Sequence, residues 1–532
     1  KYSLNNFYHL MNNKYSTNLQ NILILILVFI SFFINQYYAM QGAFPIESFA
    51  HYDISLRILS GDVPFRDYWA VSGIFIDYLQ SLFFLIFGDS FQIYVLHGSI
   101  FNVIATLISF IFFKELKLGN LYSFFYAVCF SFLAYPNTGT LYVDHHASLI
   151  CLISSLSLFK GIKYNNKKYF FIVPIFLGIA FFTKPAPTIY FLIFYILILS
   201  FYIFLKKKFY LINILTVSSF SFIFFIFLFG LLNDISFLNF LNQYVLFPTT
   251  IAENRYDGID FSIKNLVFNF DFIYIFLVPI IFFYFKSIYN IKSFLSSDKS
   301  FYYLIIFCLS LSLMFHQINT KNQLFILFLI PVLSSFLHFQ LNENKIKYSK
   351  QIILLICLIS FSLTVKYHLR FNEGRKFHEL QNVNFTKSVD ANLIDKKLKG
   401  LNWITSIDPK NPLLEVNRIK TSLKSIKKIN SKYMIITNYS FYSSVLNQNT
   451  NSPSRWFIPN GGAYPVDKKN PFFREYKNIL IDIIRRKKIE SIIIIKPIDV
   501  TEITRYLNPD CLNENKLDEI TLELKIKKNC NF

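Results

Sequence analysis

Long apolar runs recur along this chain of 532 residues, and they constrain its fold more than any other feature. The runs are about 18 residues or longer, which is the length that a helix needs to cross the hydrocarbon core of a bilayer. The chain is also 54% hydrophobic and 19% aromatic, with 65 phenylalanines, and this is not the composition of a soluble globular protein. The sequence therefore predicts a polytopic α-helical membrane protein.

We expect about 11 transmembrane helices, at residues 21–38, 92–113, 119–135, 145–160, 168–184, 186–205, 211–232, 271–285, 300–315, 322–339 and 350–367. One further apolar segment, Gly73–Gly88, is short and carries Asp77 and Gln80. A carboxylate in the hydrocarbon region is costly. We therefore expect this segment to dip into the outer interface or lie along it, without crossing.

The distribution of lysine and arginine predicts the orientation. With a cytoplasmic N-terminus, the inside loops hold 17 Lys and Arg residues and the outside loops of the membrane part hold six. Short cytoplasmic loops are enriched in Lys and Arg, so the count favours this orientation in the plasma (inner) membrane. If Gly73–Gly88 did span, the loop that precedes it would face the cytoplasm instead.

The composition changes near Tyr367, and this divides the chain into a transmembrane domain (1–367) and a C-terminal domain (368–532). The second part is polar, with strand-like runs at 433–437 and 489–497 between helix-compatible stretches, and we expect a small soluble α/β domain outside the membrane. It carries 29 Lys and Arg against 17 Asp and Glu. That excess indicates either a solvated basic surface or contact with anionic headgroups or a phosphate-bearing substrate; nucleic acid is not expected there. Cys511 and Cys530 could form a disulfide in an oxidising compartment.

A polar loop after the first span, residues 43–69, holds the most informative cluster of acids. It contains Glu47, Asp53, Asp62 and Asp67 beside a membrane, where acidic groups tend to mark function. An amphipathic stretch at Ser55–Leu59 is followed by the run SGDVPFRDYW at residues 60–69.

This loop resembles that of GT-C membrane glycosyltransferases, in which an acid, an amphipathic helix and a G-x-x-P-Y/F-R-D-F/W run follow one another. The resemblance covers roughly residues 20–200, and the later Ser72-Gly73 and Phe87-Gly88 fit it more weakly. It implies transfer of a sugar from a polyprenyl-phosphate carrier to a cell-envelope acceptor, which could be a lipid, a polysaccharide or a protein. Many relatives have Asp-Glu in the loop, but here the first position is Ile46.

The resemblance implies a catalytic carboxylate, and Glu47 is the preferred candidate for the general base, with Asp53 and Asp67 in reserve. The alternative is that Glu47 caps the helix that follows. Outside-facing cations are candidates for holding the carrier phosphate, since Arg suits bidentate phosphate contact. The residues assigned to substrate binding are Arg66, Tyr68, His145, His146, Lys184 and Arg255.

A second cluster is Asp144-His145-His146, in the outside loop before the span at 145–160. Consecutive side chains on a helix fan about 100° apart, so the three cannot meet at one point. Asp144 could act with Glu47, as the resemblance implies, or could cap the helix. A divalent metal is an open alternative, although two or three adjacent ligands do not define a site. Lys184 could bind phosphate or extend to the headgroups, and Arg255 could pair with Asp257.

Two rival functions remain open at this stage. A transporter or flippase of lipid-linked glycans would place charged or broken-helix sites near the membrane midplane, whereas these spans are almost free of charge. A polysaccharide polymerase or ligase would not need the acidic loop after the first span. A scaffold without activity also fits the departure at Ile46.

Overall fold

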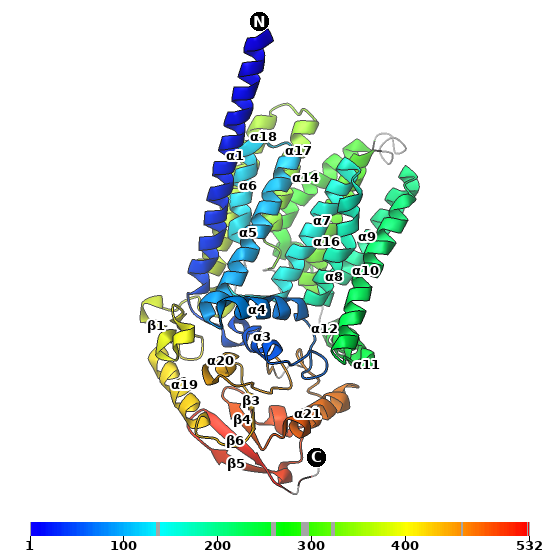
Figure 1. Cartoon of the computed structure of the whole chain (residues 1–532). Coiled ribbons are helices and arrows are strands. Elements are labelled where there is room, and N and C mark those ends of the chain that lie inside the picture. Colours follow the sequence, from blue (N-terminus) through cyan, green and yellow to red (C-terminus); the bar gives the residue numbers. More distant parts are fainter. Residues whose placement is uncertain are drawn as a thin grey trace.

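The computed structural model describes residues 2–134, 139–256, 262–288, 297–320, 325–458, 461–528 and 530, with the side chains of 2–17, 252–256 and 287 outside the description. A helical bundle forms one end of the molecule, and a region with a β-sheet forms the other (Figure 1). The bundle helices are α1 (Tyr2–Ala39), α5 (Phe91–Glu115), α6 (Gly119–Leu133), α7 (Val143–Tyr164), α8 (Lys167–Thr183), α9 (Pro185–Lys206), α10 (Tyr210–Leu232), α14 (Asp271–Ser287), α16 (Asp298–Thr320), α17 (Leu329–Glu343) and α18 (Ser349–His368).

The bundle confirms a polytopic helical membrane protein. Within the described ranges, eight segments are long and apolar enough to cross a bilayer, at Asn18–Ala39, Phe91–Glu115, Val143–Tyr164, Pro185–Lys206, Tyr210–Leu232, Ile263–Lys286, Asp298–Thr320 and Ser349–His378. The other three predicted spans fall on α6, α8 and α17, which have only 15, 17 and 15 residues. The count of eleven therefore stays a prediction.

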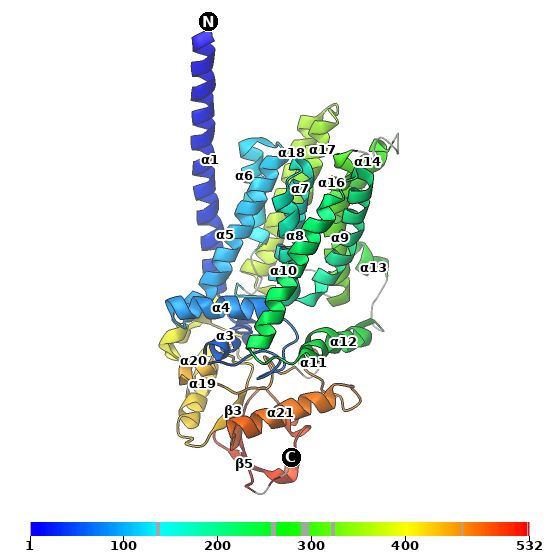
Figure 2. The same ribbon diagram turned by 45° about the vertical axis from the view of Figure 1, so that its right-hand side comes forward.

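Helix α4 (Ile74–Phe87) does not cross the bundle. It has 14 residues and, at 1.5 Å per residue, is about 21 Å long, too short to span. Figures 1 and 2 show it lying across the end of the bundle, roughly at right angles to the long helices. This course agrees with a segment that does not cross, and its placement at the outer interface stays a prediction.

The first loop is sandwiched between the bundle and the C-terminal region (residues 369–530), where it forms α2 (Pro45–Ser48) and α3 (Tyr52–Leu59). Phe49 and Tyr52 of the loop share one buried hydrophobic cluster with Trp403 and Phe441 of the C-terminal region. Trp69 belongs to a second shared cluster. The two parts are therefore joined by common cores as well as by surface contact.

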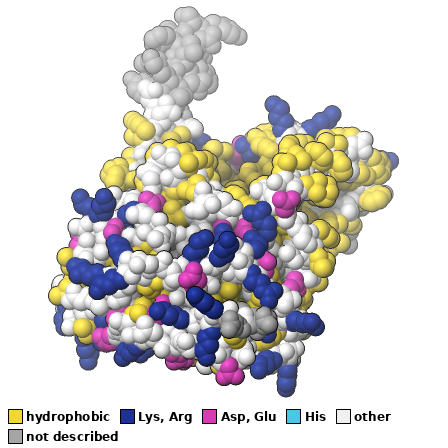
Figure 3. Space-filling view, turned by 60° about the horizontal axis from the view of Figure 1, so that its bottom comes forward, with side chains coloured by type: hydrophobic (Ala, Val, Ile, Leu, Met, Phe, Trp, Pro, Cys, Tyr) yellow, Lys and Arg dark blue, Asp and Glu magenta, His cyan; other side chains and the backbone are white. Residues whose placement is uncertain are grey.

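The C-terminal region contains a four-stranded sheet in the order β3-β4-β6-β5. The buried runs that predict strands become β3 (Tyr433–Ile436) and β4 (Ser491–Ile495), which pair in parallel. The strands β6 (Thr521–Ile526) and β5 (Leu512–Lys516) complete the sheet in antiparallel fashion. Cys511 and Cys530 form a disulfide, with a Cα–Cα distance of 5.4 Å. Figure 3 shows many Lys and Arg side chains on the outer face of this region, with Asp and Glu among them.

Shorter elements complete the fold. They are β1 (Val389–Asp390), β2 (Asn402–Trp403), α11 (Phe237–Phe240), α12 (Phe247–Tyr256), α13 (Ile263–Leu266), α19 (Pro412–Ile426), α20 (Tyr442–Leu446), α21 (Phe473–Lys487) and α22 (Thr501–Thr504). The π-helices are η1 (Leu241–Leu246) and η3 (Leu369–Glu373), and the 3₁₀ turns are η2 (Phe268–Phe270), η4 (Lys376–His378), η5 (Phe385–Lys387), η6 (Ala391–Leu393), η7 (Lys396–Leu398) and η8 (Pro509–Cys511).

Candidate functional site

Glu47 lies in the short helix α2, which starts at Pro45, a residue whose fixed φ suits the first helical position. Its carboxylate is partly buried and has no hydrogen-bond or ion-pair partner among the described residues. The cap positions of α2 and α3 are Phe44 and His51, and neither helix has a side-chain cap. The capping alternative for Glu47 is therefore not seen in the structure.

The protein environment of Glu47 favours the neutral, protonated form of its carboxyl group more than water would. Burial, and next the negative charge of Asp144, raise the pKa of Glu47 to about 7, against the opposing effect of Lys184 and Arg455. A carboxyl group that titrates near neutral pH can exchange a proton under physiological conditions. This electrostatic coupling also places Glu47, Asp144, Lys184 and Arg455 in one neighbourhood.

Asp144 lies in the first turn of α7 and is held by two other elements. Its Oδ1 accepts hydrogen bonds from Nζ of Lys184 (2.6 Å) and from Nε2 of His316 (2.7 Å). Lys184 lies at the junction of α8 and α9, and His316 lies in α16. The cap of α7 is Tyr142, without a side-chain cap, so the capping alternative for Asp144 is not seen either.

His145 and His146 point away from Asp144, as the predicted fan of side chains requires. His145 is buried with its ring edge-on to Phe325. His146 bonds through Nδ1 to the carbonyl oxygen of Tyr142 (3.0 Å) and stacks on Phe101 at 4.1 Å between ring centroids. Neither contact leads to a ligand, and their predicted role in substrate binding gains no support from this geometry.

A buried cluster of Asp77, His51 and Arg455 joins the end of the bundle to the C-terminal region. Asp77, in the first turn of α4, is fully buried, and its Oδ1 accepts a hydrogen bond from Nδ1 of His51 (2.6 Å). Its Oδ2 accepts a hydrogen bond from Nη2 of Arg455. Burial, and then the charge of Arg455, hold the pKa of His51 well below its usual value, so His51 is neutral and donates its Nδ1–H.

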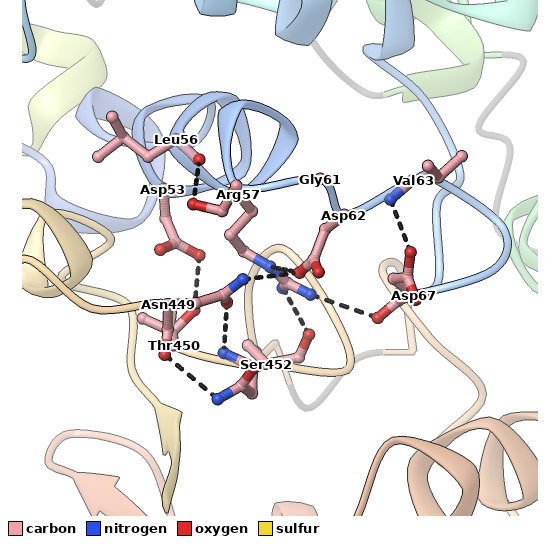
Figure 4. A network of polar contacts seen from close by, with 12 residues as sticks. Asp53, Leu56, Arg57, Gly61, Asp62, Val63, Asp67, Asn449, Thr450 and Ser452 are labelled. Atoms are coloured by element: carbon pink, nitrogen blue, oxygen red, sulfur yellow. Dashed lines mark hydrogen bonds and ion pairs between the residues drawn. The ribbon is translucent and has the colours of Figure 1, made fainter. Parts of the chain in front are cut away.

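The other acids of the first loop contact the C-terminal region (Figure 4). Asp62 accepts hydrogen bonds from Arg57 Nε (2.9 Å), Asn449 (2.9 Å) and Lys487 Nζ (2.8 Å). Asp53 accepts one from the hydroxyl of Thr450 (2.8 Å). We use the name loop clasp for one set of contacts between the first loop and the C-terminal region. Its members are Asp53, Arg57, Asp62 and Asp67 of the loop and Asn449, Thr450, Ser452, Arg486 and Lys487 of the C-terminal region.

Asp67 and Arg66 also belong to this side of the loop. Asp67 pairs with Arg486 of α21 (2.8 Å) and with Arg66 (2.8 Å), and Arg66 donates a further hydrogen bond to the carbonyl oxygen of Asn233 (2.9 Å). Burial alone would raise the pKa of Asp67, but Arg486 and Arg66 outweigh it and hold the pKa below its usual value. No described contact joins Asp53, Asp67 or Arg66 to Glu47 or Asp144.

The two remaining predicted binding residues are not brought into the site by described contacts. Tyr68 is buried beneath the guanidinium of Arg57, 4.9 Å from the ring centroid. Arg255 lies in α12, and its side chain falls outside the described residues, as does all of Asp257.

The residues do not fit a metal site. In the described part of the chain, no group of three or more His, Cys, Asp or Glu is arranged to hold a metal ion. The Asp144 oxygen that would be a ligand is already bonded to the ammonium group of Lys184, which would repel a cation. No step is therefore assigned to a metal.

A large apolar cavity of about 1160 Å³ lies beside this cluster, between α4, α8, α9 and α10. Its lining includes Phe181 and Phe182 before Lys184 and Thr188 after it, and the Thr188 hydroxyl donates to the Lys184 carbonyl oxygen (3.0 Å). Ile223 of α10 lines the cavity and is 64% exposed, so the cavity opens toward the lipid-facing side of the bundle.

Comparisons with known proteins found no matching family model and no matching curated protein. Among solved structures, the oligosaccharyltransferase AglB from Archaeoglobus fulgidus, in complex with an inhibitory peptide and a dolichol-phosphate, is 12% identical over 90% of this chain and 69% of its own, with a TM-score of 0.41. ArnT from Cupriavidus metallidurans, bound to undecaprenyl phosphate, is 10% identical over 96% of this chain and 98% of its own, with a TM-score of 0.43. At these values the likeness is weak, so the function is inferred below from this chain's own residues.

Sequence reasoning missed three members of the site and undervalued a fourth. The sequence analysis used Asp77 only as evidence that Gly73–Gly88 does not cross the membrane. A carboxylate in an apolar helix is, however, itself a signal of function. His316 begins the polar run HQINTKNQ, which in sequence cannot be distinguished from an ordinary loop between two apolar runs. His51 and Arg455 gave no signal, because their importance comes from contact with Asp77 across 26 and 378 positions of sequence.

Proposed function

We propose that the protein is a GT-C glycosyltransferase that moves a sugar from a polyprenyl-phosphate carrier to a cell-envelope acceptor, at the outer face of the plasma membrane. The observation that carries the proposal is a lipid-sized apolar cavity lined by residues on both sides of Lys184 in the chain, together with a carboxylate that has no partner among the described residues and a pKa raised to about 7. An isoprenoid tail suits a cavity that is larger than those of drug-sized ligands and opens toward lipid.

The proposed chemistry needs no group beyond these side chains. The acceptor hydroxyl or amine attacks the anomeric carbon, the bond from that carbon to the phosphate oxygen breaks, and the lipid phosphate leaves with the electron pair. Glu47 takes the acceptor proton as the new bond forms. Lys184 stabilises the negative charge that grows on the leaving phosphate. Attack from the face opposite the phosphate inverts the anomeric configuration.

Asp144 has a supporting role in this scheme. By bonding both Lys184 and His316, it fixes the position of the Lys184 ammonium group. Its negative charge raises the pKa of Glu47, which makes the base strong enough to accept a proton near neutral pH.

The outer-face location is supported by two independent features. The Lys and Arg count favours a cytoplasmic N-terminus, and the disulfide between Cys511 and Cys530 fits an oxidising compartment. On this reading the domain boundary falls near residue 368, and the first loop and C-terminal region share the outer side.

The distribution of charge favours an enzyme over a transporter. Hydrogen bonds and electrostatic coupling link Glu47, Asp77, Asp144 and Lys184 to one another or to Arg455 of the C-terminal region. A transporter binds its substrate near the midplane, at broken helices. The proposed site is instead interfacial, which suits a reaction between a lipid-borne donor and an acceptor outside the membrane.

The test is a transfer assay with purified protein in liposomes that contain undecaprenyl-phosphate-linked sugars. The readout is release of undecaprenyl phosphate with envelope extract added as acceptor. We expect release by the wild type, loss of at least 100-fold in Glu47→Gln, as expected for a general base, and no change in Glu519→Gln, an exposed acid of the C-terminal region. No release by the wild type from any such donor would refute the proposal.

A further inference from the structure

Arg455 reaches the candidate site from the C-terminal region and is almost fully buried there, at 8% exposure. Its Nη2 donates to the carbonyl oxygen of Ser72 (2.9 Å) and to Asp77. Its guanidinium also lies over the ring of Trp456, 5.2 Å from the centroid. A buried arginine is costly unless polar partners compensate it, and Asp77 and the Ser72 carbonyl oxygen are its partners. Burial raises the pKa of Asp77 to about 8, against the opposing effect of the Arg455 charge.

The backbone opposite is shaped to admit this arginine. Gly73 has a φ of +82°, and a Cβ built on it would lie 2.3 Å from Nη1 of Arg455 and 2.7 Å from Cε1 of His51. Any side chain there would collide with both groups, and the left-handed backbone also favours glycine. The turn before α4 therefore leaves room for Arg455 and His51 together.

The loop clasp seats the segment that carries Arg455. Asn449 and Thr450 are bonded to Asp62 and Asp53, and the carbonyl oxygen of Ser452 accepts a hydrogen bond from Nη1 of Arg57 (2.6 Å) (Figure 4). The carbonyl oxygen of Pro453 accepts one from the backbone N–H of Trp69 (2.9 Å). Hydrogen bonds at these four residues thus fix the path of the chain just before Arg455.

One nitrogen of Arg455 is left without a partner. Nη1 is buried and has no hydrogen bond among the described residues, although a guanidinium seeks to use all its donors. The charge of Arg455 nevertheless acts on Glu47, together with Asp144 from α7 and Lys184 from the α8–α9 junction. Arg455 therefore does more than hold two parts of the fold together.

We infer that the C-terminal region completes the candidate site: Arg455 is a positioning residue that anchors the Asp77–His51 pair and brings its positive charge to the neighbourhood of Glu47. This inference goes beyond the proposed function, because it concerns how this chain holds the site carboxylate, whatever substrate is used. It makes the C-terminal region part of the site and not a separate accessory domain.

The experiment measures the protonation of Glu47 directly, without any substrate. Infrared difference spectra of the full-length protein in detergent are recorded as a function of pH, and the Glu47→Gln variant identifies the carboxyl band. Loss of the Arg455 charge in Arg455→Gln should move the Glu47 midpoint upward by roughly half a pH unit to one unit, as expected for removal of a nearby opposite charge. Arg455→Lys should stay near the wild-type midpoint.

The matched control is Arg418→Gln, which removes an arginine of the same region that pairs with Asp408 and Glu519, away from the site. It should leave the midpoint unchanged. If Arg455→Gln leaves Asp77 stranded and the protein does not fold, Arg455→Gln with Asp77→Asn removes the stranded carboxylate and should still show the upward shift. An unchanged midpoint in either variant, or failure of both to fold while Arg455→Lys folds, would overturn the inference.

The same variants separate this inference from the proposed function. If the wild type releases no undecaprenyl phosphate but the midpoint shifts as described, the proposed function fails and the inference stands. If the wild type is active and the midpoint in Arg455→Gln does not move, the inference fails and the proposed function stands. With both correct, the pH at which activity is half-maximal should shift upward in Arg455→Gln by the same amount as the infrared midpoint.

Discussion

Arg57→Met offers the sharpest test of how the two halves of the molecule are held together. Arg57 is 1% exposed and donates hydrogen bonds to the Asp62 carboxylate (2.9 Å), the Ser452 carbonyl (2.6 Å) and the Asp67 carbonyl (3.3 Å). Methionine keeps most of the side-chain length but removes the charge and every donor. The substitution leaves Asp62 with Lys487 and Asn449 as partners.

The expected cost follows from these contacts. Asp62 and Asp67 belong to the first loop with Arg57, so only the hydrogen bond to the Ser452 carbonyl is broken when the C-terminal region opens. A hydrogen bond from a charged group contributes about 1.5–3 kcal/mol, and we take about 2 kcal/mol for this one. Since 1.4 kcal/mol is a factor of ten, the population in which the C-terminal region opens from the first loop should rise by about 30-fold.

The assay is limited proteolysis of the protein in detergent, at low protease, where the cleavage rate follows the population of the opened state. The control is Arg418→Met, because Arg418 makes only partly exposed pairs with Asp408 and Glu519, and solvent-exposed ion pairs contribute little to stability. Cleavage of Arg57→Met at the rate of Arg418→Met would show that the loop clasp does not hold the two halves together.

Three further predictions concern the site and its surroundings. Transfer should fall about tenfold per pH unit below pH 7, because Glu47 must be ionised to accept a proton and its pKa is raised to about 7; a profile that is flat from pH 5 to 8 would remove Glu47 as the base. Ile189→Trp, at a partly exposed position of the cavity wall, should raise the KM for a long-chain polyprenyl donor at least tenfold but leave that for a short-chain analogue nearly unchanged, and equal effects on both would contradict the cavity as the site of the tail. A periplasmic reporter such as alkaline phosphatase fused after residue 375 should be active, and activity of a cytoplasmic reporter at the same position would reverse the proposed orientation.

The bundle was predictable from sequence because its signal is local. Each apolar run specifies its own helix, and the runs at 92–113 and 211–232 fall inside α5 and α10. The ends of the helices were less predictable: α6 and α17 have only 15 residues each, so composition alone did not settle how many segments cross. The course of α4, which does not cross, was predictable because Asp77 and its short length both oppose a crossing.

The site was only partly predictable because its contacts are long-range. Glu47, Asp144 and Lys184 were identified from charge beside apolar runs and from the resemblance, and the structure brings them together. Nothing in the sequence around Arg455 points to a carboxylate 378 positions earlier. Side-chain partners across such separations follow from the packing of whole elements, which no local pattern records.

The four acids of the first loop stand together in one short polar stretch of the sequence, but the structure gives them different partners. Asp62 and Asp67 each bind two or more cationic groups, which keep the pKa of both below the usual value despite burial. Asp53 is buried with Thr450 as its hydrogen-bond donor. These carboxylates gain stability from their contacts, so a role in holding the fold is enough to explain them.

Glu47 lacks that explanation. Glu47 is partly buried without a partner among the described residues, which disfavours its charged form, and this burial is the main cause of its raised pKa. Glutamine or a small apolar residue would fill the same position without the penalty, and no helix cap or ion pair would be lost. The proposed function accounts for a carboxylate at this position, because the proposed reaction needs a group there that accepts a proton.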